Sequence, residues 1–176
     1  MLEAVEIEPD DKDWTWVLHR RCPECGFDAS TFPAESVSAA LRVNAAAWVQ
    51  LLGQPAEELR RRPRPDQWAP LEYACHVRDV CTLYEQRLGL MLSEDDPLYP
   101  NWDQDAAAVE GDYLRQEPRE VAPVLLGAAE SLAAAFDGVG PGQWERRGRR
   151  SDGASFTVAT FSRYMIHDPV HHLWDV

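Results

Sequence analysis

Four long segments repeat an apolar residue every three or four positions, and this repeat constrains the fold more than any other feature of the chain. Such spacing gathers apolar side chains on one face of an α-helix. The segments span residues 33–53, 70–92, 118–136 and 157–176. Proline stands at the start of three of them, at Pro33, Pro70 and Pro118, where a helix tolerates it. Because each helix must bury its apolar face against another, the pattern predicts an all-α four-helix bundle.

The composition agrees with one helical domain. Ala and Leu dominate the apolar residues, which make up 45% of the 176 positions, and this favours helix over sheet. Residues 1–32 are polar and without a regular repeat. We therefore expect an irregular N-terminal extension over 1–32, carrying a Cys-x-x-Cys turn, and the bundle over 33–176.

The net charge of −13 restricts the partners. A nucleic-acid or anionic membrane surface needs clustered cations, so neither is expected as a partner. No apolar run approaches the ~20 residues that span a bilayer, and the acidic N-terminus does not resemble a signal peptide. We expect a cytoplasmic protein with a small-molecule substrate; the oligomeric state stays open, a homodimer included.

Three of the five histidines lie in the last ten residues. His167 and His171 are four positions apart, so a helix presents both imidazoles on one side, a common way to hold a metal ion. His76 lies on the inward stripe of the segment 70–92 and is the expected third ligand. Three ligands leave a divalent ion with an open position, which catalysis needs. The alternative is that these histidines are ordinary hydrogen-bonded residues.

Several other residues are candidates for the surroundings of this ion. Asp168 could accept the second N–H of a ligating imidazole. Glu72, one turn before the histidine of the second helix, is a candidate general base, and Asp79 is a further catalytic or orienting candidate. Trp68 and Trp102 are expected to line a pocket. The arginine clusters at 60–64 and 146–150 are either solvated surface or a rim that receives a carboxylated or phosphorylated molecule.

Cys22 and Cys25 form a Cys-x-x-Cys pair with no second cysteine pair nearby in sequence. A structural zinc ion needs four ligands. Cys75 and Cys81 would point in different directions from one helix, which leaves His19 as the nearest further candidate. We expect a tight turn with two free thiols. A second metal site, a redox pair, or a flap over the mouth of the bundle's metal site are the alternatives.

Two runs resemble metal motifs of the DinB-like superfamily. The run from Trp68 to Asp79, with Glu72 and His76 inside it, is similar to the first motif, and His167 to His172 is similar to the second. The resemblance covers about residues 33–176. It implies a four-helix bundle in which three histidines bind zinc or nickel; iron and manganese are further candidates.

The better-understood relatives in that superfamily include thiol-dependent enzymes. In the mycothiol-dependent maleylpyruvate isomerase, one ligand of the second motif is Glu, whereas His167 stands there in this chain, so the isomerase reaction does not carry over. The resemblance implies a metal-dependent transferase of a low-molecular-weight thiol, of the mycothiol type, acting on a small electrophile. A non-catalytic metal-binding or stress-response protein and a hydrolase that uses metal hydroxide are the alternatives.

Overall fold

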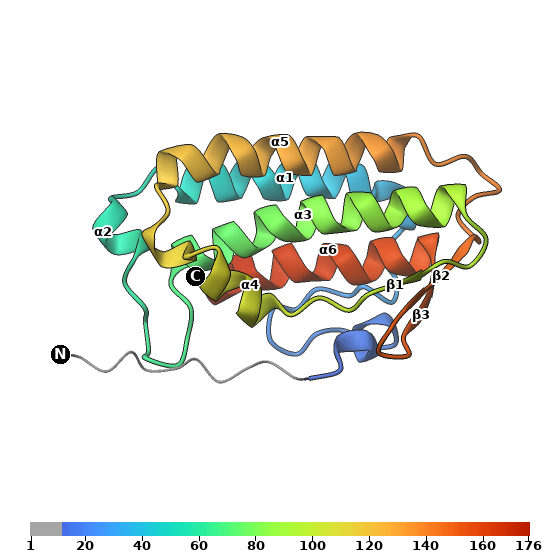
Figure 1. The fold of residues 1–176 in the computed structure, drawn as a ribbon, viewed down its shortest axis with the longest axis horizontal. Coiled ribbons are helices and arrows are strands. Elements are labelled where there is room, and N and C mark those ends of the chain that lie inside the picture. Colours follow the sequence, from blue (N-terminus) through green and yellow to red (C-terminus); the bar gives the residue numbers. More distant parts are fainter. Residues whose placement is uncertain (1–11) are drawn as a thin grey trace.

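The computed structural model describes residues 12–176 and confirms the predicted all-α four-helix bundle (Figure 1). The four long helices lie close to the predicted segments. They are α1 (Val37–Leu51), α3 (Pro70–Ser93), α5 (Pro118–Asp137) and α6 (Val158–Asp175). A 3-10 turn, Ala34–Ser36, precedes α1, and the short helix α2 (Ala56–Leu59) follows it.

The order of the helices in space differs from their order in the chain. Helices α5 and α6 each pack against both α1 and α3. In Figure 1, α3 and α5 run in one direction and α1 and α6 in the other. Because α3 and α5 follow each other in the chain and point the same way, the chain between them must run back along the bundle in a long connection. It contains β1 (Leu98–Tyr99), α4 (Gln104–Glu110) and a 3-10 turn, Tyr113–Arg115.

A small sheet at one end of the bundle joins this return connection to the start of α6. Strand β2 (Arg147–Arg150) pairs antiparallel with β3 (Ser155–Thr157) and parallel with β1. Gly148 lies against the bundle so closely that a Cβ atom would stand 2.7 Å from Met91 Cγ. The sheet therefore packs directly against α3.

Helix α6 begins with a reciprocal cap. The Thr157 hydroxyl accepts from the backbone N–H of Thr160 at 3.1 Å, and the Thr160 hydroxyl accepts from the N–H of Thr157 at 2.9 Å. Such caps are worth about 1 kcal/mol each. They fix where α6 starts and so which residues its later turns carry.

Residues 12–32 lie beside α6 (Figure 1) and contain one 3-10 helix, Trp14–Leu18. The first eleven residues of the predicted N-terminal extension lie outside the described residues. Between positions 12 and 176, no helix is long and apolar enough to cross a membrane.

Buried polar contacts tie α6 to α1. The helix continues through Pro169, and the Pro169 carbonyl oxygen accepts from Asn44 Nδ2 at 3.0 Å and from Trp48 Nε1 at 3.3 Å. Both donors are buried on α1. Because buried donors strongly require an acceptor, these bonds set the position of the α6 turn that carries the histidines.

We expect Asn44→Ala to lower the free energy of unfolding by about 1–3 kcal/mol, because it removes a buried hydrogen bond to the Pro169 carbonyl. Urea denaturation followed by circular dichroism measures this change. Gln50→Ala, at an exposed position of the same helix, is the control and should stay within about 0.5 kcal/mol. Equal stabilities for the two variants would contradict the role given to Asn44.

Candidate metal centres

The last turns of α6 present metal-ligating side chains on two neighbouring faces. Consecutive residues of a helix point about 100° apart, whereas residues four apart lie on the same side. His167 and His171 therefore face the N-terminal segment, while Asp168 and His172 face α3. Each face forms its own group, in which all the ligand atoms lie within 4.8 Å of one another.

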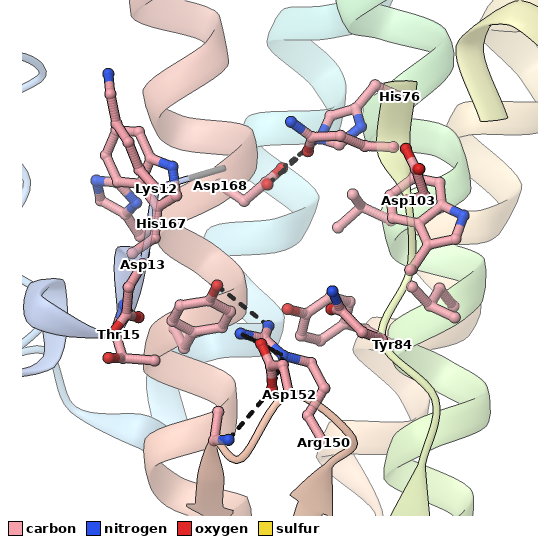
Figure 2. A pocket seen from close by; sticks show the side chains of 18 of the residues that line it. Lys12, Asp13, Thr15, His76, Tyr84, Asp103, Arg150, Asp152, His167 and Asp168 are labelled. Carbon is pink, nitrogen blue, oxygen red and sulfur yellow. Dashed lines mark hydrogen bonds and ion pairs between the residues drawn. The ribbon is translucent and has the colours of Figure 1, made fainter. Parts of the chain in front are cut away.

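The first group consists of His76, Asp168 and His172. His76 Nε2 lies 3.3 Å from Asp168 Oδ2 (Figure 2), and His172 Nε2 lies 3.8 Å from the same oxygen. Two buried atoms of this group, His76 Nδ1 and Asp168 Oδ1, have no hydrogen-bond partner among the described residues, although Oδ1 also lies 3.3 Å from His76 Nε2. A buried polar atom left without a partner is costly, so the group fits a bound cation.

The charges of this group also suit a divalent metal ion. Burial alone would raise the pKa of Asp168, but the neighbouring His76 and His172 lower it to about 2, so the carboxylate stays ionised. His172 Nδ1 lies 2.8 Å from Asp175 Oδ2, which fixes the orientation of the imidazole. Two imidazoles and one carboxylate form a donor set that suits zinc, iron and manganese.

This group opens onto a pocket of about 780 Å³ (Figure 2). Trp102 lines the pocket and stacks on the His76 ring at a centroid distance of 5.4 Å. Trp68 contacts the same ring at 5.4 Å but does not line the pocket. His76 is thus held between two tryptophans. The other polar residues of the pocket wall include Asp13, Arg87, Asp103, Arg150, Asp152 and Tyr164.

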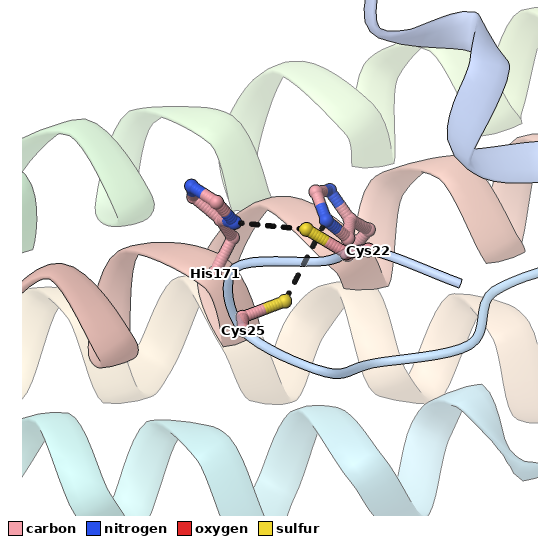
Figure 3. A group of neighbouring side chains, drawn as sticks. Cys22, Cys25 and His171 are labelled. Atoms are coloured by element: carbon pink, nitrogen blue, oxygen red, sulfur yellow. Dashed lines mark hydrogen bonds between the residues drawn. The ribbon is translucent and has the colours of Figure 1, made fainter. Parts of the chain in front are cut away.

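The second group joins the Cys-x-x-Cys turn to α6 (Figure 3). Cys22 Sγ lies 3.6 Å from His171 Nδ1, and Cys25 Sγ lies 3.7 Å from His167 Nε2. Cys22 and both histidines are buried, and Cys25 is partly exposed. Neither cysteine takes part in a disulfide.

The protein environment favours the neutral form of both imidazoles of this second group, whereas burial raises the pKa of the Cys25 thiol to about 11. Burial and then the neighbouring His171 lower the pKa of His167 to about 4, so its imidazole is neutral near pH 7 and keeps a free lone pair. Burial also lowers the pKa of His171, although Asp175 opposes this. The turn itself is closed by the Gly26 N–H, which donates to the Cys22 carbonyl at 3.1 Å.

The structure divides the three histidines of the predicted site between the two groups. His76 lies with Asp168 and His172, whereas His167 and His171 lie with the cysteines. A single ion held by His76, His167 and His171 stays a prediction. Because His172 points about 100° away from His171 on a helix, the sequence predicted it as a surface or supporting residue. The structure groups it with His76 and with Asp168, which lies four positions before it.

Two predicted carboxylates have other partners. The Glu72 carboxylate accepts from Arg62 at 2.7 and 2.9 Å and from the Ala69 N–H at 2.8 Å, which caps the start of α3. The Asp79 carboxylate accepts from the Tyr113 hydroxyl and from Arg78. Neither carboxylate lines the pocket.

Comparison with known proteins identifies the family. The model of the DinB superfamily matches residues 39–176. The chain therefore belongs to the DinB superfamily, which confirms the resemblance seen in the sequence. No curated protein matches significantly.

A solved structure supports the fold. YfiT from Bacillus subtilis, described as a probable metal-dependent hydrolase with an unusual four-helix bundle topology, matches with a TM-score of 0.63. The match covers 96% of this chain and 89% of YfiT, at 18% sequence identity. At that identity the likeness shows the fold alone.

Proposed function

We propose that His76, Asp168 and His172 hold a divalent metal ion and that the chain is a metal-dependent enzyme acting on a small molecule. The observation that carries the proposal is a group of three candidate ligands in the wall of a large pocket, two of which have a buried atom without a hydrogen-bond partner. Three protein ligands leave a position for an exchangeable ligand, as in catalytic sites. A purely structural ion would instead be enclosed by a fourth protein ligand.

The residues around the group have separate tasks. Trp68 and Trp102 each contact the His76 ring at a centroid distance of 5.4 Å and so restrict its orientation. The Asp175 carboxylate contacts the Nδ1 atom of His172 and fixes the orientation of that imidazole. A bound ion would supply Lewis acidity and lower the pKa of a water or thiol on its open side.

The pocket favours a substrate with an anionic group. Arg87 lines it, is 4% exposed and donates to the Pro100 carbonyl at 2.7 Å. Burial lowers the pKa of Arg87, but a guanidinium stays protonated in proteins. No carboxylate pairs with Arg87 within the part of the chain that the structure describes. The rings of Tyr84 and Tyr99 lie 5.5 and 4.9 Å from the Arg87 guanidinium and stabilise it in part. A substrate carboxylate or phosphate would supply the counter-charge that this buried cation lacks.

The pocket also bears on the type of reaction. Hydrolysis by a metal-bound water is assisted by a general base that accepts its proton, and three of the five carboxylates of the pocket wall are already engaged. Asp13 accepts from the N–H of Thr15, Asp103 caps α4, and Asp152 pairs with Arg150 at 2.8 Å. A thiol bound to a metal is deprotonated without such a base. Transfer of a mycothiol-type thiol to a small electrophile is therefore our first candidate.

Hydrolysis is the second candidate, favoured by the fold shared with YfiT, which is described as a probable metal-dependent hydrolase. The two reactions are distinguished by their products. Thiol transfer yields a thioether conjugate and consumes the thiol, whereas hydrolysis consumes only water.

We expect Asp168→Ala and His172→Ala each to remove one metal ion per chain and to abolish conjugation of a small thiol to an electrophilic probe such as monochlorobimane. Elemental analysis of the purified chain and fluorescence of the conjugate measure the two effects. His19→Ala is the matched control, since His19 belongs to neither group. Full metal content in His172→Ala would contradict the ligand assignment. Probe hydrolysis without conjugation would favour the second candidate, and neither reaction would favour a non-catalytic protein.

Arg87→Met should weaken the binding of small dianions such as succinate or inorganic phosphate by about tenfold or more, because it removes the charge-assisted contact with the anion. Quenching of tryptophan fluorescence, with Trp102 in the pocket wall, measures the affinity. Arg147→Met removes a charge at an exposed position of β2 and should leave it unchanged. Equal affinities for both variants would show that Arg87 does not bind the anion.

A further inference from the structure

We propose that Cys22, Cys25, His167 and His171 form a second metal site, a closed tetrahedral zinc site that fixes the N-terminal segment to α6. This site is separate from the open group of the proposed function. It has four protein ligands instead of three and shares no ligand with that group.

The spacing of the ligand atoms matches a tetrahedral zinc ion. With Zn–S of about 2.3 Å and Zn–N of about 2.0–2.1 Å, the sulfur–nitrogen edge of a tetrahedron is about 3.6 Å. The two sulfur–nitrogen distances are 3.6 and 3.7 Å. Two separate thiol–imidazole hydrogen bonds would need no common centre, yet all four ligand atoms lie within 4.8 Å of one another. The convergence of all four favours one ion.

The chemistry of the ligands indicates zinc. The chain combines Cys-x2-Cys with His-x3-His, which is the ligand type and spacing of structural Cys2His2 zinc sites. Each thiol releases its proton to solvent when it binds zinc, and the two thiolates then balance the charge of the ion. A neutral site of this kind is compatible with the burial of Cys22 and both histidines.

The surroundings complete the site. Glu24, inside the cysteine turn, places its carboxylate 3.3 Å from His171 Nε2, the ring nitrogen that faces away from Cys22. Such a carboxylate is the usual partner of a zinc-bound imidazole. The Trp14 ring lies 5.7 Å from the His167 ring and 5.1 Å from the His171 ring. His167 and His171 also line the pocket, but four protein ligands would fill a tetrahedral zinc ion and leave it no coordination position for a substrate.

The proposed ion also has a consequence for the pocket. It fixes the α6 turn that carries Asp168 and His172 on its neighbouring face. It also holds the segment around Asp13 and Trp14, which forms part of the pocket wall. The closed site thus positions both the open group and one side of its pocket.

Cobalt substitution of the full-length chain tests the proposal. A thiolate bound to Co²⁺ gives an intense near-ultraviolet charge-transfer band, and only the closed site contains thiolates. We expect the wild-type cobalt protein to show this band without any added thiol. The double variant Cys22→Ser/Cys25→Ser should lose the band and one zinc ion per chain. The matched variant Cys75→Ser/Cys81→Ser, which changes the two cysteines of α3, should keep both.

The result does not depend on the folding of a variant, because the wild-type protein alone can overturn the proposal. A fully loaded wild-type cobalt protein without the band would do so. Equal rates of alkylation of Cys22 and Cys25 by iodoacetamide with and without zinc would do so as well. Asp168→Ala should keep the band while it loses the other ion, so the two proposals fail separately.

Discussion

One turn of α6, from His167 to His172, is held from three sides, and the rest of the structure depends on that arrangement. The face that carries His167 and His171 contacts the cysteine turn. The face that carries Asp168 and His172 contacts His76 of α3. Between them, the Pro169 carbonyl accepts hydrogen bonds from α1. Because the faces of a helix rotate together, each contact restricts the other two.

The arrangement brings charged and polar groups into the interior of a small bundle. Arg87 is buried and Asp168 is partly buried, and each is costly to desolvate unless an opposite charge compensates it. A metal ion would compensate Asp168, and an anionic substrate would compensate Arg87. The charges of Asp168 and Arg87 would then both be balanced only when the metal ion and the substrate are bound. The metal content would therefore affect the affinity for the substrate.

Much of the fold could be predicted from local sequence, whereas the grouping of the ligands could not. Pro70, Pro118 and Thr157 mark helix starts, and the apolar repeats give the helix lengths. The two-residue strand β1 leaves no such pattern. In the segment 167–172 the spacing of four occurs twice, and only tertiary packing decides which pair meets His76. The partners of Cys22 and Cys25 lie more than 140 residues away in sequence, so no local spacing could identify them.

We infer that α6 carries two metal sites on adjacent faces. Crystals of the zinc-loaded chain, with anomalous diffraction recorded on both sides of the zinc absorption edge, test it most directly. We expect two zinc peaks. One is bonded to the sulfurs of Cys22 and Cys25, and the other lies next to Asp168 and His172. One peak bonded to His76, His167 and His171 together, with the cysteine sulfurs unligated, would contradict it.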